Sequence, residues 1–185
     1  MLEIRLHGRG GQGAVTSAEL LAVAAIEEGK YAQGFPSFGP ERRGAPVAAF
    51  CRIDDRPIRL RSKIYAPDAV IVLDPSLLGV SNPSAGLKAG GVIIINTNKT
   101  EAEIRKEYGM KCRLALVDAY HIAREELGVP ITNTTMLGAL IGATQAIKPE
   151  SMEAPLMERF GKIAARNVKA FRRAVAETKI YPAKD

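Results

Sequence analysis

The sequence predicts an α/β protein with three layers, a mostly parallel sheet, a Rossmann-like N-terminal unit and a helical C-terminal part. Three observations favour this class. Residues 2–6 alternate in polarity before a glycine-rich turn and a helical pattern. Residues 69–74, 91–96 and 114–118 are apolar runs, typical of strands covered on both faces of a parallel sheet. From residue 133 onward, apolar residues recur at helical spacing.

Length and composition predict one globular domain over residues 1–185, with 179–185 as a loosely held tail. The chain is 46% hydrophobic and 25% charged, with a mean hydropathy of −0.02, which excludes overall disorder. No apolar run is long enough for a membrane span, so we expect no membrane association. The N-terminus lacks the pattern of a secretory leader, which predicts a cytoplasmic location.

Charge and cysteine content limit the partners. The net charge of +6 and the pI near 9.4 permit anionic ligands. Nucleic acid is not expected, because no basic stretch is interleaved with aromatic residues. A zinc or cluster site needs about four thiolate or imidazole ligands. Cys51 and Cys112 stand apart in the sequence, and only His7 and His121 are available besides, so we expect no metal site. Both cysteines are expected to be reduced, unligated and largely buried.

The first third of the chain contains one unusual segment. A helix over 14–28 ends at Gly29 and Lys30, and a short strand over 31–33 follows. The segment 34–44 then holds three glycines and two prolines, and fits no regular element. Residues 45–53 and 57–60 flank a polar turn and predict an antiparallel hairpin. We therefore expect 34–44 to contact a ligand or a partner.

The central apolar strands each end in a short polar residue: Asp74, Asn96 and Asp118. Ligands of open α/β sheets bind at the carboxyl ends of the strands. Helices are predicted over 119–127, 133–147 and 152–177, with Pro149 and Pro155 marking a helix boundary and a first-turn proline. The sequence therefore places a candidate site at one edge of the sheet.

The glycine turn satisfies the GxGxxG pattern through Gly8, Gly10 and Gly13. Glycine lets backbone amides approach an anion, and the helix N-terminus adds partial positive charge. A NAD site would also need an acidic residue about 20 positions later. The chain has none between Glu28 and Glu41, which argues against that site. The alternative is that these glycines only form a tight turn.

Two further segments are candidates for ligand contact. Arg42 and Arg43 lie in a glycine-bounded loop and suit bidentate capture of phosphate or carboxylate, although a solvated basic turn is the alternative. Asn133 and Thr134 open a helix of small residues, for which a plain N-cap is the alternative. His7 follows the first strand, where an imidazole can touch a ligand. No nucleophile or acid accompanies it, so no catalytic residue is assigned.

Three stretches together resemble the gamma subunit of the 2-oxoacid:ferredoxin oxidoreductases, the pyruvate synthase group. They are the Gly-x-Gly-Gly-Gln-Gly turn at 8–13, the Gly-Pro-Glu-x-Arg-Gly loop at 39–44, and Asn-Thr-x-Met-Leu-Gly-Ala at 133–139. The resemblance runs from residue 1 to about 175. One departure is Ala45, where the family more often repeats glycine, and it leaves the loop conformation open.

The resemblance implies a subunit of a complex that converts pyruvate or a related 2-oxoacid, coenzyme A and oxidised ferredoxin into acyl-CoA, carbon dioxide and reduced ferredoxin. Partners would be the alpha, beta and delta subunits, which would hold thiamine diphosphate and the iron-sulfur clusters. The single gamma-type domain would contribute to coenzyme A binding and to assembly, and be inactive alone. The implied coenzyme A or anion site comprises Gly8, Gly10, Gly11, Gln12, Gly13, Arg42, Arg43, Asn133 and Thr134.

Several alternatives stay open at this point. The indolepyruvate oxidoreductase beta chain shares the glycine motif. An NADP-dependent reductase of Rossmann type is another alternative, because Arg42 and Arg43 suit a 2'-phosphate. A third is a structural assembly subunit without any ligand. For the isolated chain we expect Phe35, Phe38 and Arg43 to be exposed, and to become buried in the complex or in a homodimer.

Overall fold

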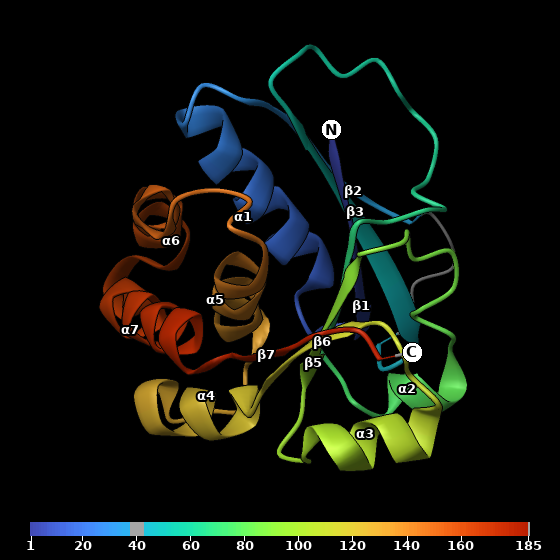
Figure 1. The fold of residues 1–185 in the computed structure, drawn as a ribbon. Coiled ribbons are helices and arrows are strands. Elements are labelled where there is room, and N and C mark those ends of the chain that lie inside the picture. Colours follow the sequence, from blue (N-terminus) through green and yellow to red (C-terminus); the bar gives the residue numbers. More distant parts are fainter. Residues whose placement is uncertain (38–42, 185) are drawn as a thin grey trace.

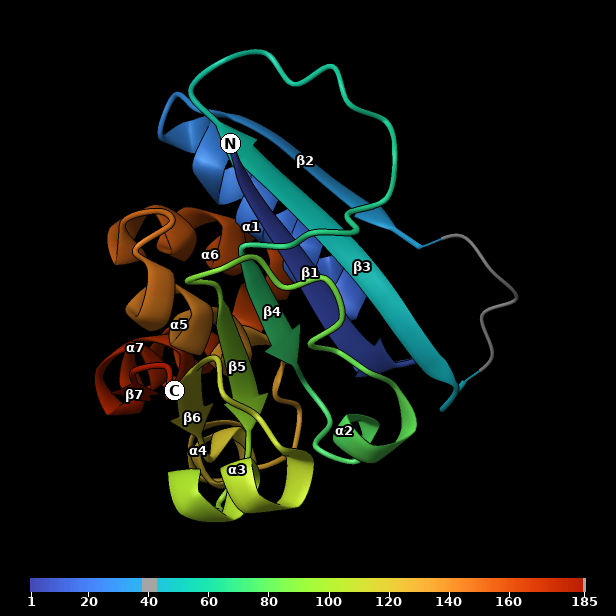
Figure 2. The same ribbon diagram turned by 45° about the vertical axis from the view of Figure 1, so that its right-hand side comes forward.

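The computed structural model describes residues 1–37 and 43–184, and these form a single mixed sheet flanked by helices. The described strands follow the order β2-β3-β1-β4-β5-β6-β7 (Figure 2). They are β1 (Leu2–Arg9), β2 (Tyr31–Pro36), β3 (Pro46–Asp54), β4 (Ala69–Val72), β5 (Val92–Asn96), β6 (Arg113–Val117) and β7 (Lys179–Tyr181). The helices are α1 (Ala14–Glu27), α2 (Leu77–Val80), α3 (Glu101–Tyr108), α4 (Ala119–Leu127), α5 (Asn133–Thr144), α6 (Glu153–Phe160) and α7 (Ala164–Glu177), with short 3-10 turns at Pro149–Met152 and Gly161–Ile163.

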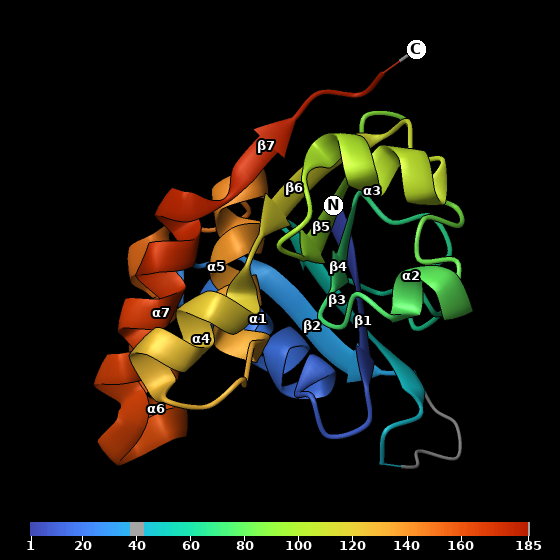
Figure 3. The same ribbon diagram turned by 90° about the horizontal axis from the view of Figure 1, so that it is seen from below.

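The three-layer α/β class predicted from the sequence is confirmed. Helices α1 and α4 to α7 cover one face of the sheet, and α2 and α3 cover the other (Figures 1 and 3). Successive residues of the apolar strands serve opposite cores, since Ile71 and Ile94 pack toward α5 while Val70 and Ile93 pack toward α3. The continuous apolar runs are therefore explained by helices on both sides.

The sheet is mixed, not mostly parallel. Strands β1, β4, β5 and β6 run parallel, and the apolar runs predict this for β4, β5 and β6. Antiparallel strands flank them on both sides: β3 and β2 beyond β1, and β7 beyond β6. The N-terminal unit consequently differs from a nucleotide-binding βαβ unit, because antiparallel β3 lies between β1 and β2.

Two local expectations need correction. The segment 57–60 forms no strand, and β3 pairs with β2 and β1 instead, because both offer longer ladders than a short hairpin arm. The expected loose tail also differs, since residues 179–181 form β7 against β6. Lys184 then donates its backbone N–H to the Lys111 carbonyl at 2.8 Å, so backbone pairing holds this end in place.

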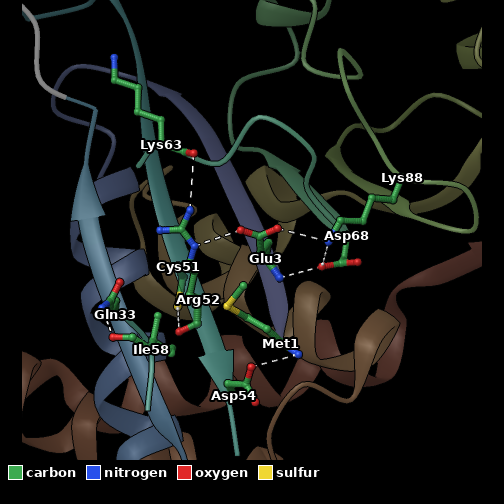
Figure 4. Close-up of polar contacts among 10 residues, drawn as sticks. All are labelled: Met1, Glu3, Gln33, Cys51, Arg52, Asp54, Ile58, Lys63, Asp68 and Lys88. Carbon is green, nitrogen blue, oxygen red and sulfur yellow. Dashed lines mark hydrogen bonds and ion pairs between the residues drawn. The ribbon is translucent and has the colours of Figure 1, made fainter. Parts of the chain in front are cut away.

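The long segment between β3 and β4 is fastened by a buried arginine (Figure 4). Arg52 is only 1% exposed, and its Nε donates to Glu3 Oε1 at 3.0 Å. Its Nη2 donates to the Lys63 carbonyl, and its guanidinium lies 5.5 Å from the Phe35 ring centroid. Lys88 bonds both Glu3 and Asp68 in the same network. These contacts tie the segment to β1, β3 and the start of β4.

Candidate functional site at the glycine turn

The glycine turn connects the carboxyl end of β1 to the N-terminus of α1. Gly11 and Gly13 have φ values of 93° and 84°, which residues with a side chain rarely adopt. Gly13 is the N-cap of α1, so the following amides, Ala14 to Thr16, point out of the helix without intrahelical partners. The turn therefore has the geometry that an anion-binding helix N-terminus requires.

The turn and the Arg-Gly segment that precedes β3 lie side by side. Gly10 forms a parallel bridge with Arg43. Its N–H donates to the Ala45 carbonyl at 2.8 Å, and its carbonyl accepts from the Gly44 N–H at 3.0 Å. Arg43 is exposed. The structure thus brings together two of the predicted site segments, while Arg42 and Phe38 lie outside the described residues.

Gln12 has a bracing role in this structure. Its Oε1 accepts from the Arg9 backbone N–H at 2.7 Å, and its Nε2 donates to Asp74 Oδ2 at 2.8 Å. Both polar groups of this predicted ligand residue are thus used within the chain. The brace fixes the turn against the end of β4.

Arg9 and Asp74 extend the brace. Arg9 Nε lies 3.3 Å from Asp74 Oδ2, and its Nη atoms donate to Ser76 Oγ and the Gly44 carbonyl. Burial alone would raise the pKa of the Asp74 carboxyl, but hydrogen bonds from Ser76 and Gln12 and the charge of Arg9 outweigh it, so this pKa is lowered. Sequence reasoning noted Asp74 only as a strand end and missed Arg9. Asp74 follows β4, the parallel neighbour of β1, and this adjacency is the signal that pairs them.

Asn133 lies at the start of α5, directly against the turn. A Cβ added to Gly13 would lie 2.7 Å from Asn133 Nδ2, so the Asn133 side chain packs directly against the Gly13 backbone. Asn133 is 5% exposed, and its Oδ1 has no hydrogen-bond partner within residues 1–37 and 43–184. The N-termini of α1 and α5 therefore meet beside a buried amide group with unused hydrogen-bonding capacity.

Thr134 is fully buried and faces α7 instead. Its Oγ1 donates to Asn167 Oδ1 at 2.9 Å, and the Asn167 amide donates to the Ile163 carbonyl. The structure therefore places Thr134 in the packing between helices, away from the turn. The N-cap alternative is not realised either, because the N-cap is Thr132 and its side chain makes no capping bond.

His7 lies on β1 between Ala48 of β3 and Val72 of β4. Burial, reinforced by the charge of Arg5, lowers the pKa of its imidazole to about 4. Its Nε2 is buried and has no partner in the described part of the chain. The ring is consequently neutral at physiological pH and points away from the α1 face.

The other strand-end residues serve the fold. Asn96 Nδ2 donates to the Leu73 carbonyl, and its Oδ1 accepts from the Ala119 N–H, so its amide joins β4 to α4. Asp118 caps α4 by accepting from the His121 N–H at 2.9 Å. Polar groups do lie at this edge, as the sequence predicts, but the Asn96 amide and one Asp118 oxygen are used within the protein.

Cys51 and Cys112 are free thiols. Cys51 is fully buried, and burial raises its pKa to about 12. Cys112 is only partly buried, because it precedes β6 at the rim of the core. Among the described residues no three His, Cys, Asp or Glu side chains gather closely enough to hold a metal ion. No helix in the same residues has the length and apolar character to cross a membrane.

Fold and turn together define an α/β domain with an anion-compatible helix N-terminus. The sequence profile of the pyruvate ferredoxin/flavodoxin oxidoreductase family matches residues 3–177, so the chain belongs to this family. It is 56% identical over 183 residues to the common gamma subunit of the pyruvate/ketoisovalerate oxidoreductases of Thermococcus litoralis, covering 98% of this chain and 99% of that one.

Solved structures agree with this assignment. The crystal structure of pyruvate oxidoreductase subunit PORC from Thermotoga maritima matches with a TM-score of 0.87 and 39% identity, over 97% of both chains. The 2-oxoglutarate:ferredoxin oxidoreductase of Magnetococcus marinus, solved with 2-oxoglutarate, coenzyme A and succinyl-CoA, matches with a TM-score of 0.74 and 21% identity. That match covers 95% of this chain and 30% of the longer one, and shows the shared fold.

Proposed function

We propose that the chain is the gamma subunit of a 2-oxoacid:ferredoxin oxidoreductase acting on pyruvate, and that its glycine turn contributes to the coenzyme A site. Coenzyme A carries a pyrophosphate and a ribose phosphate, and such groups suit helix N-termini and arginine. Coenzyme A is also a ligand of the Magnetococcus marinus enzyme, which contains this fold. A cytoplasmic location is part of the proposal.

One observation carries the proposal: separate sequence segments converge on the turn. Gly10 is bridged to Arg43, and Gly13 lies against Asn133 at the start of α5. The outward amides of α1, the backbone of the exposed residue Arg43 and the buried Asn133 side chain with its unpaired Oδ1 therefore lie next to the turn. Any helix start has outward amides, but a purely structural turn needs neither the adjacent arginine nor the unpaired oxygen.

The proposal assigns the redox chemistry to the alpha, beta and delta partner subunits. Cys51 is fully buried in β3, and Cys112 lies apart from it before β6, so this chain does not fit an iron-sulfur cluster. The thiamine diphosphate and the clusters would reside in those partners, and the complex would reduce ferredoxin. The chain alone would then have no 2-oxoacid oxidation activity.

The fold gives no support to a stand-alone NADP reductase. In a dinucleotide-binding unit the strand after the first helix lies parallel beside the first strand and holds the ribose at its end. Here antiparallel β3 occupies that position. The family match and the named relatives also concern oxidoreductase subunits.

Coenzyme A titration of the assembled enzyme tests the proposal. We expect Arg43→Gln to weaken coenzyme A binding about tenfold, because a charge-assisted phosphate contact contributes about 1.4 kcal/mol or more. Lys106→Gln is the control, since Lys106 is also an exposed cation but lies on α3, on the opposite face of the sheet from α1. Equal affinity in wild-type and Arg43→Gln enzymes would remove Arg43 from the site. Unchanged 2-oxoacid oxidation by a complex lacking this chain would refute the subunit role.

A further inference from the structure

Strand β2 forms a free edge of the sheet. Ser37 donates its N–H to the Ala48 carbonyl, and the antiparallel register then pairs residues 31, 33 and 35 with β3. The backbone N–H and C=O of Ala32 and Gly34 consequently point away from the sheet. Pro36 also lies at an outward position, where its missing N–H costs no ladder bond.

This edge has little of the usual protection against pairing. Exposed edge strands commonly carry charged side chains, prolines, bulges or a covering element, and β2 has only Pro36, at its end. Residues 31–36 include no charged side chain, and no described strand pairs with the outer side of β2. The opposite edge strand, β7, is only three residues long and begins with a lysine. The two edges are therefore not equivalent.

A groove of about 520 Å³ runs along the free edge of β2. Helix α1 forms one wall with Val23 and Ile26, which are 42% and 54% exposed. Ala32, Gly34 and Phe35 of β2 also line it. Gly34 is required here, because an added Cβ would lie 2.6 Å from the Ala18 carbonyl oxygen of α1. The groove thus combines unpaired backbone groups with exposed apolar side chains.

The charged residues around the groove favour a partner segment of a particular composition. Arg61 lines it from the segment after β3, and Glu19 lines it from α1. Between Arg56 and Lys63 the segment has four cations and no carboxylate: Arg56, Arg59, Arg61 and Lys63. Figure 2 shows this segment arching over β3 close to β2. A partner segment would complement this groove with apolar side chains toward α1 and a carboxylate toward Arg61.

We propose that an extended segment of a partner subunit adds to β2 as a further strand. Its backbone pairs with Ala32 and Gly34, its apolar side chains contact Val23 and Ile26, and a carboxylate pairs with Arg61. The inference rests on the subunit role proposed above, because the partner subunit supplies the strand.

Hydrogen exchange tests the backbone part. Peptides covering residues 31–36 are followed in the free chain and in the complex assembled with the partner subunits of the same organism. The added strand slows exchange of the Ala32 and Gly34 amides at least tenfold upon assembly. Failure to assemble would refute the subunit role, whereas assembly with unchanged exchange overturns this inference alone. Protection that grows with the concentration of the free chain assigns the edge to a second copy and also overturns it.

Substitutions test the groove independently. Ala32→Pro removes an outward N–H without a ladder bond, and Arg61→Glu reverses the charge. Each of these two substitutions weakens assembly at least tenfold. Their controls leave assembly unchanged: Ala32→Ser keeps the backbone N–H, and Lys106→Glu reverses a charge on the exposed surface of α3. Thermal unfolding of the free variants checks that they fold. Ile26→Glu places a charge in the groove without altering β2, and it should also weaken assembly. Val80→Glu, on the exposed surface of α2, is its control and should not. Equal assembly by all variants overturns the proposal.

Discussion

Gly13 illustrates how one residue sets the geometry of the candidate site. Its φ of 84° disfavours any side chain, and its neighbour Asn133 leaves no room for one. We predict that Gly13→Ala lowers the free energy of unfolding by roughly 2–3 kcal/mol, from backbone strain and steric overlap together. Urea denaturation measures this cost.

Gly29→Ala separates the two causes. Gly29 has a φ of 81° but nothing within 4 Å of an added Cβ, so only the strain of about 1–2 kcal/mol applies. Asn133→Ala should also relieve part of the cost of Gly13→Ala in a double-mutant cycle. An additive cycle would show that the close approach to Asn133 has no energetic weight.

His7 makes stability depend on pH. Because the pKa of this imidazole falls from 6.5 to about 4 on folding, the unfolded chain binds more protons between these values. The contribution is fully present above pH 6.5 and is lost as pH falls through 4, a total of about 3 kcal/mol. Urea unfolding at pH 7 and pH 4.5 should show a smaller loss for His7→Gln than for the wild type. His121→Gln, which removes the only other histidine, should keep the His7 contribution. The same pH dependence in His7→Gln and wild type would contradict the buried neutral imidazole.

At the scale of elements, the helix pair α5 and α7 depends on small residues. A Cβ on Gly138 would lie 2.2 Å from the Phe171 carbonyl oxygen of α7. Gly138→Ala should therefore destabilise the protein by roughly 2–3 kcal/mol, although alanine favours helices by about 1 kcal/mol. Gly79→Ala in α2 meets no atom within 4 Å and serves as the control, for which thermal unfolding should show no loss. Equal stability of the two variants would contradict the close helix contact.

Sequence patterns predicted elements better than pairings. The buried central strands were evident because helices cover both faces, so the interior residues of these strands are apolar without alternation. The antiparallel placement of β3 next to β1 was not evident from the sequence. Alternating polarity shows which residues of a strand face the core, but not which strand lies beside it. The strand β7 was missed because three residues carry too little pattern.

The site was predictable in part for related reasons. The glycines at 11 and 13 predict a turn because glycine adopts positive φ values readily, and both residues have positive φ in the structure. Which polar side chains remain available to a ligand depends on their hydrogen-bond partners in the folded chain, which the sequence does not show. Gln12 and Thr134 are used within the chain, whereas Asn133 keeps an unpaired oxygen. Arg9 became visible only once β4 was placed beside β1.

At the scale of the whole molecule, the carboxyl ends of the parallel strands and the free edge at β2 have separate uses in our account. The carboxyl end holds the glycine turn, with Arg43 and Asn133 beside it. The free edge at β2 and the basic segment after β3 provide a surface for partner subunits. This division fits a family whose members include subunits of larger oxidoreductases.

The central claim, that the glycine turn binds the phosphates of coenzyme A, is tested most directly at Gly11. An added Cβ there meets nothing within 4 Å, so Gly11→Asp and Gly11→Asn differ in charge but share the same backbone strain. In the assembled enzyme the carboxylate should raise the KM for coenzyme A about tenfold over the amide, a repulsion of about 1.4 kcal/mol. The KM for the 2-oxoacid and the kcat at saturating coenzyme A should agree between the two variants. Equal KM values for coenzyme A in Gly11→Asp and Gly11→Asn would contradict the account.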